Sequence, residues 1–289
     1  MIKKGIILAG GMGTRMSPLT KAVNKQLLPL YDKPLIFYPL SVLMLAGIKH
    51  ILIIVNKGQL NQFRKILPEK NNLGVNIEYK EQFKPGGLPQ AFTIGEKFIG
   101  EDNVSLILGD NFFYGQSLTK ILKKNISLRT GAKIFIHPVK NPRLYGVATL
   151  DKNKKVTKLL EKPKNTRSNL AVTGLYFFDN KVIEFTKRLK PSKRGELEII
   201  DLLNIYKKKN KLKAEVIGRG GSWLDTGNIK DFYDASNFIS AIENRQGLKI
   251  ACLEEIALNN NWIDQKHVKK SIDFYGNCDY SKYLKSLIS

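Results

Sequence analysis

Cysteine and histidine are both scarce in this chain of 289 residues. It has 2 cysteines, Cys252 and Cys278, which form no CxxC pattern, and 3 histidines. A zinc site or a disulfide framework needs more of these residues at close spacing, so we expect two free, buried thiols. None of the histidines stands in a visible Ser-His or Cys-His arrangement, and this argues against nucleophilic catalysis of that kind.

Long apolar runs are also missing. No stretch approaches the length that crosses a bilayer, and the run at 2–9 is too short for a signal-peptide core and ends in glycines. We therefore expect a cytoplasmic protein with no membrane partner. A hydrophobic fraction of 43% and a charged fraction of 25% are ordinary for a globular protein, and a chain of this length can bury a large core.

Acidic residues are few relative to basic ones. The chain has 25 Asp and Glu against 48 Lys and Arg, which gives a net charge of +23. Nucleic-acid-binding proteins carry such an excess, but they concentrate it, whereas the basic residues here are dispersed along the chain. Lysine, asparagine and isoleucine are all plentiful, as an AT-rich genome would produce. We predict no nucleic-acid partner, although an anionic small substrate would be drawn to this surface.

The first half of the chain alternates apolar strands with helical patterns. Strands are expected at 2–9, 50–55, 75–80, 104–108 and 132–138, and helices at 35–47, 59–67, 88–98 and 118–128. This order predicts an α/β fold with a Rossmann-like, mostly parallel sheet flanked by helices.

The second half is more mixed and ends in a helical tail. Strands at 146–150 and 154–160 flank a hairpin-like turn, 171–178 is a strongly apolar strand, and helices are expected at 196–208 and 228–243. Short helices follow over 254–287, where proline is absent. Because no linker or repeat divides the chain, we expect one domain over 1–289.

A glycine-rich turn, GGMGTRM, follows the first expected strand directly. Ligands of parallel α/β sheets bind beyond the carboxyl ends of the strands, where glycines allow the backbone to approach an anion. A dinucleotide fingerprint needs a third glycine where this chain has Met16, although Asp32 stands near the distance expected for a ribose-binding acid. A Walker A loop needs a lysine that does not follow this turn. The turn matches neither of those two patterns. It therefore predicts either a phosphate-binding turn of another type or a plain structural turn.

Downstream motifs decide between these readings. The stretch LAGGMGTRM is followed by LTKAVNKQLLPLYDKP, EQFKPGGLPQAF, LGDNFFYG, LEKP, KPSKRGELEI and GSWLDTG. With these motifs the chain closely resembles the sugar nucleotidyltransferase family, and within it the bacterial glucose-1-phosphate thymidylyltransferases. The resemblance covers essentially the whole chain, and it implies a GT-A-like version of the expected fold. It divides the single domain into a mainly nucleotide-binding half (1–130), a mainly sugar-binding half (131–245) and a helical C-terminal cap (246–289).

The implied reaction joins dTTP and glucose 1-phosphate into dTDP-glucose and pyrophosphate, the first step toward dTDP-rhamnose and related deoxysugars. A sugar-phosphate oxygen attacks the α-phosphorus in line, with no covalent enzyme intermediate. Such chemistry asks the protein for positioning and charge neutralisation. The resemblance assigns this work to Arg15, Lys25, Asp110, Lys162 and Asp225 as the catalytic set.

Nucleotide binding is assigned, by the same resemblance, to the glycine turn and a few residues beyond it. Arg15 suits paired phosphate oxygens because its guanidinium is a planar fork. Gln82 and Gly87 take the base-reading positions. The full nucleotide set is Leu8, Gly10, Gly11, Gly13, Thr14, Arg15, Gln26, Gln82, Gly87 and Asp110.

Two aspartates are candidates for Mg²⁺ ligands. Asp110 ends the apolar strand at 104–108, where a carboxylate could bind a hard cation or merely cap a turn. Asp225, in WLDTG, resembles the second ligand of the family. Two separated carboxylates plus substrate phosphates make a plausible magnesium site.

The sugar phosphate is assigned to the second half. Glu161 would accept hydrogen bonds from sugar hydroxyls, and Lys162 would hold the phosphate, although Glu-Lys before a proline is more often a solvated loop. The full set is Tyr145, Gly146, Glu161, Lys162, Val172, Gly174 and Tyr176.

The resemblance further implies a homotetramer, a dimer of dimers, with feedback by a dTDP-sugar at a second site. That site would lie near Tyr114, Gly115, Arg219, Glu255 and Ile256. Here the sequence departs from several relatives, since Thr119 stands where they carry histidine.

Other functions stay open at this stage. A sibling enzyme could use UTP, CTP or ATP, or another hexose 1-phosphate, because a uracil ring lacks only one methyl group, worth about 1–3 kcal/mol of discrimination. An NAD-dependent dehydrogenase would need the missing third glycine, and a nucleic-acid-binding protein would need clustered basic and aromatic residues.

Overall fold

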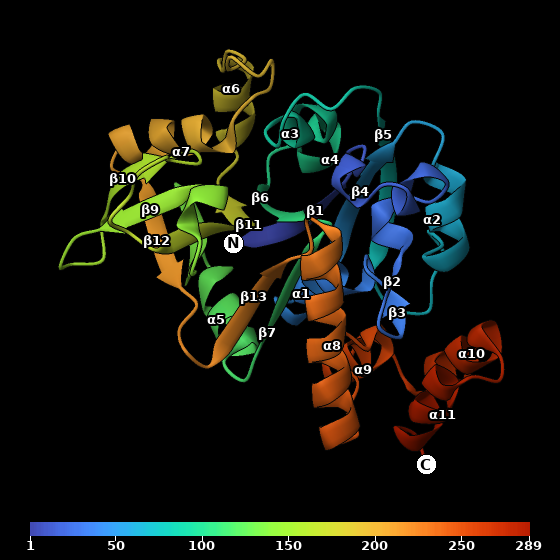
Figure 1. The fold of residues 1–289 in the computed structure, drawn as a ribbon. Helices are drawn as coiled ribbons and strands as arrows, with labels where there is room; N and C mark the ends of the chain where they lie inside the picture. Colours follow the sequence, from blue (N-terminus) through green and yellow to red (C-terminus); the bar gives the residue numbers. More distant parts are fainter.

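A nine-stranded sheet runs through the computed structural model, which describes all 289 residues (Figure 1). Its first half is parallel, in the order β6-β1-β4-β5. These strands are β1 (Ile2–Ala9), β4 (His50–Asn56), β5 (Asn76–Gln82) and β6 (Asn103–Leu108). Residues 5–9 of β1, 51–55 of β4 and 104–107 of β6 are buried on both faces of the sheet, because helices cover both faces.

Strand β11 (Leu170–Phe178) joins this half to the rest of the sheet. It lies antiparallel to β6, β8 and β9, and is buried from Ala171 to Phe178. The neighbouring strands are β8 (Ala132–Pro138), β9 (Val147–Leu150), β10 (Val156–Leu160) and β12 (Leu212–Val216). The α/β fold with its largely parallel sheet is thus confirmed, and the antiparallel strands belong to the second half.

Period-2 alternation along the strands sends side chains to two separate cores. Ile7, Ile53 and Ile107 face one core, which contains α1 (Phe37–Leu45), α2 (Leu60–Ile66) and α5 (Leu118–Asn125). Ile6, Ile54 and Leu106 face the other, against α3 (Gln90–Ile94), α4 (Glu96–Ile99), α6 (Val182–Lys187) and α7 (Ile199–Lys208).

A two-stranded antiparallel ribbon crosses below this sheet. It pairs β7 (Asn111–Gly115) with β13 (Gly221–Asp225), and the long helix α8 (Ile229–Gln246) follows it. A third, smaller core contains Met16, Phe112 and Phe232, so the segment after the glycine turn is packed against α8.

The tail is helical, as predicted, with α9 (Leu253–Asn259), α10 (Gln265–Tyr275) and α11 (Asp279–Ser286). Helix α9 packs on α1, and Figure 1 places α10 and α11 at the periphery, far from β9 and β10. The remaining elements are the short pair β2 (Pro29–Leu30) and β3 (Lys33–Pro34), and the 3₁₀ turns Thr14–Met16, Leu19–Lys21, Lys25–Leu27 and Pro142–Leu144.

Two expectations are wrong in detail. The helix expected at 196–208 begins only at Ile199, because Leu197 is extended and pairs with Gly87. Of the two cysteines, Cys252 is buried, but Cys278 is exposed because it precedes α11 at the surface. None of the helices has the length and apolar character that a bilayer span requires.

Candidate active site

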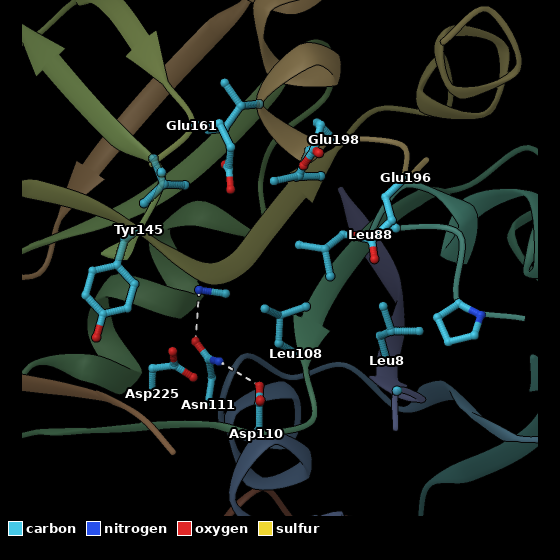
Figure 2. Close-up of a pocket in the computed structure, with 18 of the residues that line it drawn as sticks. Leu8, Leu88, Leu108, Asp110, Asn111, Tyr145, Glu161, Glu196, Glu198 and Asp225 are labelled. Atoms are coloured by element: carbon cyan, nitrogen blue, oxygen red, sulfur yellow. Dashed lines mark hydrogen bonds between the residues drawn. The ribbon is translucent and has the colours of Figure 1, made fainter. Parts of the chain in front are cut away.

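A pocket of about 380 Å³ lies at the carboxyl ends of β1 and β6, where the two halves meet. That volume is within the range of small-molecule sites. Figure 2 shows Asp110, Asn111 and Asp225 on one side of it, Glu161 and Glu198 opposite, and Tyr145 and the leucines Leu8 and Leu88 at its two ends.

Most of the residues singled out in the sequence line this one pocket. From the nucleotide set they are Leu8, Gly10, Gly11, Arg15, Gln26, Gln82, Gly87 and Asp110, and from the sugar and metal sets Tyr145, Gly146, Glu161, Lys162, Val172, Gly174, Tyr176 and Asp225. Gly13 and Thr14 lie on the same turn but outside the lining. Lys25 is buried and reaches the site through an ion pair with Asp110.

The glycine turn is held in place by the side chain of Asn56 at the end of β4. Gly11 donates its N–H to Asn56 Oδ1 and accepts from Asn56 Nδ2, both at 2.8 Å. Gly13 adopts a left-handed conformation (φ 60°) as it begins the 3₁₀ turn that carries Arg15. A side chain at Gly10 would lie 2.3 Å from Gln82 Oε1, so glycine there gives Gln82 its room.

Gln82 is buried at the leucine end of the pocket. Its Nε2 donates to Gln90 Oε1 at 2.7 Å, and the same oxygen accepts from the N–H of Gly86. Position 87 requires glycine for two reasons. Its φ is 93°, and a Cβ there would lie 2.0 Å from the carbonyl oxygen of Leu197. The loop at 84–88 is therefore fixed against the segment that precedes α7.

The two aspartates are brought together by the β7–β13 ribbon. Asp225 is the register partner of Asn111, which follows Asp110 in the chain. Burial raises the pKa of the Asp225 carboxyl to about 7, and the negative charge of Asp110 adds to this shift. Burial would raise the pKa of Asp110 too, but Lys25, 2.7 Å away, holds it below its usual value.

Asn111 is a buried residue that the sequence reasoning missed. Its Oδ1 accepts from the N–H of Gly174 at 3.0 Å and from Trp223 Nε1 at 2.6 Å, while its Nδ2 donates to Asp110 Oδ1 at 3.1 Å. A Cβ at Gly174 would lie 2.5 Å from Asn111 Oδ1. The amide thus links β11, β13 and the Asp110 carboxylate (Figure 2).

Thr226 was also missed. Its N–H and its hydroxyl both donate to the carbonyl oxygen of Asp110, at 3.1 and 2.8 Å. These two hydrogen bonds fix the end of β13 to the segment that carries Asp110. Asn111 belongs to the motif LGDN and Thr226 to the motif WLDTG. Most of their hydrogen-bond partners lie far away in the chain, so neighbouring residues in the sequence do not reveal them.

The Tyr145 end of the pocket is more polar. Lys162 has a positive φ (38°), which is uncommon for a residue with a side chain, and its N–H donates to the carbonyl oxygen of Tyr145. Burial raises the pKa of Glu161, with Lys162 opposing the shift. Burial and the Asp225 charge raise the pKa of Tyr145 to about 12, so its hydroxyl is protonated and available as a donor.

Residues of the segment 194–198 complete the lining, and its last part, 196–198, precedes the helix that was expected to begin at Glu196. The guanidinium of Arg194 donates to both carboxylate oxygens of Glu198, and lies 3.6 Å from Glu161. Glu196 and Leu197 line the same wall. In KPSKRGELEI the residues Leu197 and Glu198 are extended, and the helical apolar spacing begins to apply only from Ile199.

The donors present suit magnesium. No group of three or more His, Cys, Asp or Glu side chains converges anywhere in the chain, so a cation held by protein ligands alone is not indicated. Mg²⁺ binds through one or two carboxylates and completes its shell with waters and substrate phosphates. Asp110 and Asp225, two adjacent acids open to a pocket, fit that pattern.

The residues expected at a feedback site lie outside the pocket in two groups. Tyr114 and Gly115 are at the end of β7, and Arg219 is in the turn that leads into β13. Glu255 and Ile256 are on α9, where Glu255 accepts a hydrogen bond from Tyr283. No hydrogen bond or ion pair joins the two groups.

Comparison with known proteins fits this geometry. The family model described as nucleotidyl transferase matches residues 4–242, and the chain belongs to that family. It is 49% identical over 285 residues to the glucose-1-phosphate thymidylyltransferase of Neisseria meningitidis, and 47% identical over 285 residues to that of Mycolicibacterium smegmatis, with 99% of each chain covered in both alignments.

Solved structures share the fold. A Bacillus anthracis protein in complex with sucrose matches with a TM-score of 0.75 and 38% identity, covering 81% of this chain and 94% of that one. A UDP-glucose pyrophosphorylase complexed with UDP-glucose matches with a TM-score of 0.72 and 28% identity, covering 85% of this chain and all (100%) of the other.

Proposed function

We propose that this chain is a glucose-1-phosphate thymidylyltransferase, which converts dTTP and glucose 1-phosphate into dTDP-glucose and pyrophosphate. The observation that carries the proposal is the pocket itself. It combines a glycine turn bearing Arg15, a pair of adjacent carboxylates, and a polar end around Glu161. Full-length similarity to enzymes of that name supports the choice of substrates.

In this proposal each end of the pocket takes one substrate. The base lies against Leu8, Leu88 and Gln82, and the glycine turn follows the triphosphate. The sugar lies near Tyr145, Gly146 and Glu161, with Lys162 at its phosphate. The two phosphates to be joined then meet between Arg15 and the aspartates, where in-line attack needs charge neutralisation more than proton transfer.

We also propose that the cofactor is Mg²⁺, held by Asp110 and Asp225. When bound, the ion would neutralise phosphate charge during transfer. Arg15 and Lys25 supply the remaining positive charge from the protein, and Asn111 orients the Asp110 carboxylate.

Further expectations accompany this function as proposals. The residues form one domain with the three regions given above, in a homotetramer with feedback by a dTDP-sugar at the Tyr114 and Glu255 region. The enzyme works in the cytoplasm and feeds dTDP-rhamnose or a related deoxysugar pathway.

The experiment that tests the function is pyrophosphate release. The purified protein is incubated with Mg²⁺, glucose 1-phosphate and each nucleoside triphosphate in turn. We expect release with dTTP, weaker release with UTP, and a loss on the order of a hundredfold in Arg15→Ala, because removing one preorganised charge contact costs that much in comparable sites. No release with either dTTP or UTP would overturn the proposal, and a clear preference for UTP would transfer it to the sibling enzyme.

A further inference from the structure

Arg15 is an exposed, unpaired cation near two aspartates. It is close enough to Asp110 and Asp225 to lower the pKa of each carboxyl. Yet Arg15 forms no hydrogen bond or ion pair with any side chain, whereas Lys25 is paired with Asp110. The guanidinium therefore lies near Asp225 without forming an ion pair with it.

Gly227 lies beside both groups, and its missing side chain leaves space between them. A Cβ at this position would lie 3.1 Å from Arg15 Nη2, 3.2 Å from Arg15 Nη1 and 3.1 Å from Asp225 Oδ2. All three distances are tighter than ordinary van der Waals contact. The guanidinium and the carboxylate therefore both rest on the bare backbone of one glycine.

The backbone of Gly227 does not itself require glycine. Its φ lies outside the left-handed region, in contrast to the φ of Gly11 and Gly13 on the glycine turn. An alanine would meet no backbone strain there, so the requirement for glycine comes from the two side chains that touch it.

Neither neighbour of Gly227 can move to make room. Thr226 is tied to Asp110 by two hydrogen bonds, and Asn228 caps α8 by accepting from the N–H of Asp231 at 2.9 Å. On the other side, Met16 anchors the turn that carries Arg15 in the core beneath α8. Of the two side chains nearest this Cβ position, that of Arg15 is exposed and that of Asp225 is half-buried, so we expect the Arg15 tip to yield first.

We propose that Gly227 is a positioning residue for Arg15. Because it has no side chain, it leaves room for the guanidinium to lie at the pocket beside Asp225, so that the cation stays available to phosphate oxygens and the carboxylate to metal. The proposal rests on the proposed function for its phosphate, but it makes a separate claim about Gly227.

The test is Gly227→Ala, which should fold and displace the Arg15 tip. We expect kcat to fall by about ten- to a hundredfold, because small misplacements of a catalytic group cost that much, while KM for glucose 1-phosphate stays within about twofold. Gly218→Ala is the matched control, since a Cβ there has no neighbour within 4 Å and its φ is also outside the left-handed region. The control should keep kcat.

A double-variant cycle separates positioning from simple damage. If Gly227 acts through Arg15, then Gly227→Ala should cost little more in an Arg15→Ala background. An equal loss in both backgrounds would overturn the proposal. Should Gly227→Ala fail to fold, the double variant still decides, since removing the displaced side chain should restore folding; continued unfolding would count against it.

Binding of inorganic pyrophosphate in the absence of metal, measured by calorimetry, gives a readout independent of turnover. We expect binding to the wild type and to Gly218→Ala, and binding about tenfold weaker to Gly227→Ala and Arg15→Ala, the loss typical of one charged contact. Equal binding to Gly227→Ala and Gly218→Ala would overturn the inference even in an active enzyme. Absence of wild-type turnover with intact binding differences would overturn the proposed function alone.

Discussion

At the scale of single residues, Asp225 combines a buried carboxyl with a neighbouring negative charge. Both effects favour the protonated form and raise its pKa to about 7, against an ordinary value of 3.8. Between these two values the folded protein binds more protons than the unfolded chain. Stability from this group therefore falls as pH rises from about 4 to about 7 in the absence of metal.

Asp225→Asn should remove this dependence. We expect the variant to be more stable than the wild type at pH 8, by on the order of 1–3 kcal/mol, and the difference to shrink at pH 5. Urea unfolding at the two pH values without divalent cations measures it. Asp273→Asn, at an exposed position with no ion pair, is the control and should change neither value. A stability gap for Asp225→Asn that is the same at both pH values would contradict the prediction.

At the scale of elements, a buried charge cluster joins α8 to the β2–β3 hairpin and the start of the tail. Glu243 accepts hydrogen bonds from Lys33 Nζ at 3.1 Å and from the N–H of Ile250 at 2.8 Å. Lys33, with 2% of its side chain exposed, also pairs with Asp32, and Lys249 reaches both acids. The cluster attaches the start of the C-terminal segment to the β2–β3 pair in the first part of the chain.

Glu243→Ala should destabilise the protein by about 3–5 kcal/mol, because it leaves the buried Lys33 ammonium with half of its negative partners. The double variant Lys33→Met with Glu243→Leu should lose less, since no unpaired charge remains. Chemical denaturation followed by circular dichroism measures both. Asp234→Ala, which breaks the exposed pair with Lys230, is the control and should cost little. A double variant less stable than Glu243→Ala would contradict the prediction, because it would show that the loss does not come from an unpaired buried charge.

At the scale of the whole molecule, the period of the apolar residues predicted most of the parallel sheet. The rule that parallel strands present their carboxyl ends at one edge then placed the glycine turn and Asp110 together correctly. Asp225 could not be placed this way, because it depends on the register of β13 with β7, more than a hundred residues apart in sequence. The resemblance supplied it. Asn111 and Thr226 escaped because their roles consist of hydrogen bonds to distant backbone and side chains, which local spacing does not encode.

The net charge of +23 is also a property of the whole molecule, and it bears on substrates that are anions. Dispersed basic residues create a positive potential that extends over roughly 10 Å at 0.1 M salt and attracts phosphates to the pocket. We expect kcat/KM for dTTP to fall severalfold between roughly 0.05 and 0.5 M NaCl, as the Debye length shrinks. By contrast, kcat at saturating substrate should change little, since contacts inside the pocket are screened less.

Steady-state kinetics across that salt range, with Mg²⁺ held in excess, measure the effect. Sucrose is the control additive, because it alters viscosity and osmolarity without screening charge. If kcat/KM were flat with salt, the positive charge would have no influence on substrate capture, and the excess of lysine would be a matter of composition alone. A fall in kcat of the same size would instead indicate that salt acts on the Lys25–Asp110 and Arg15 contacts within the site.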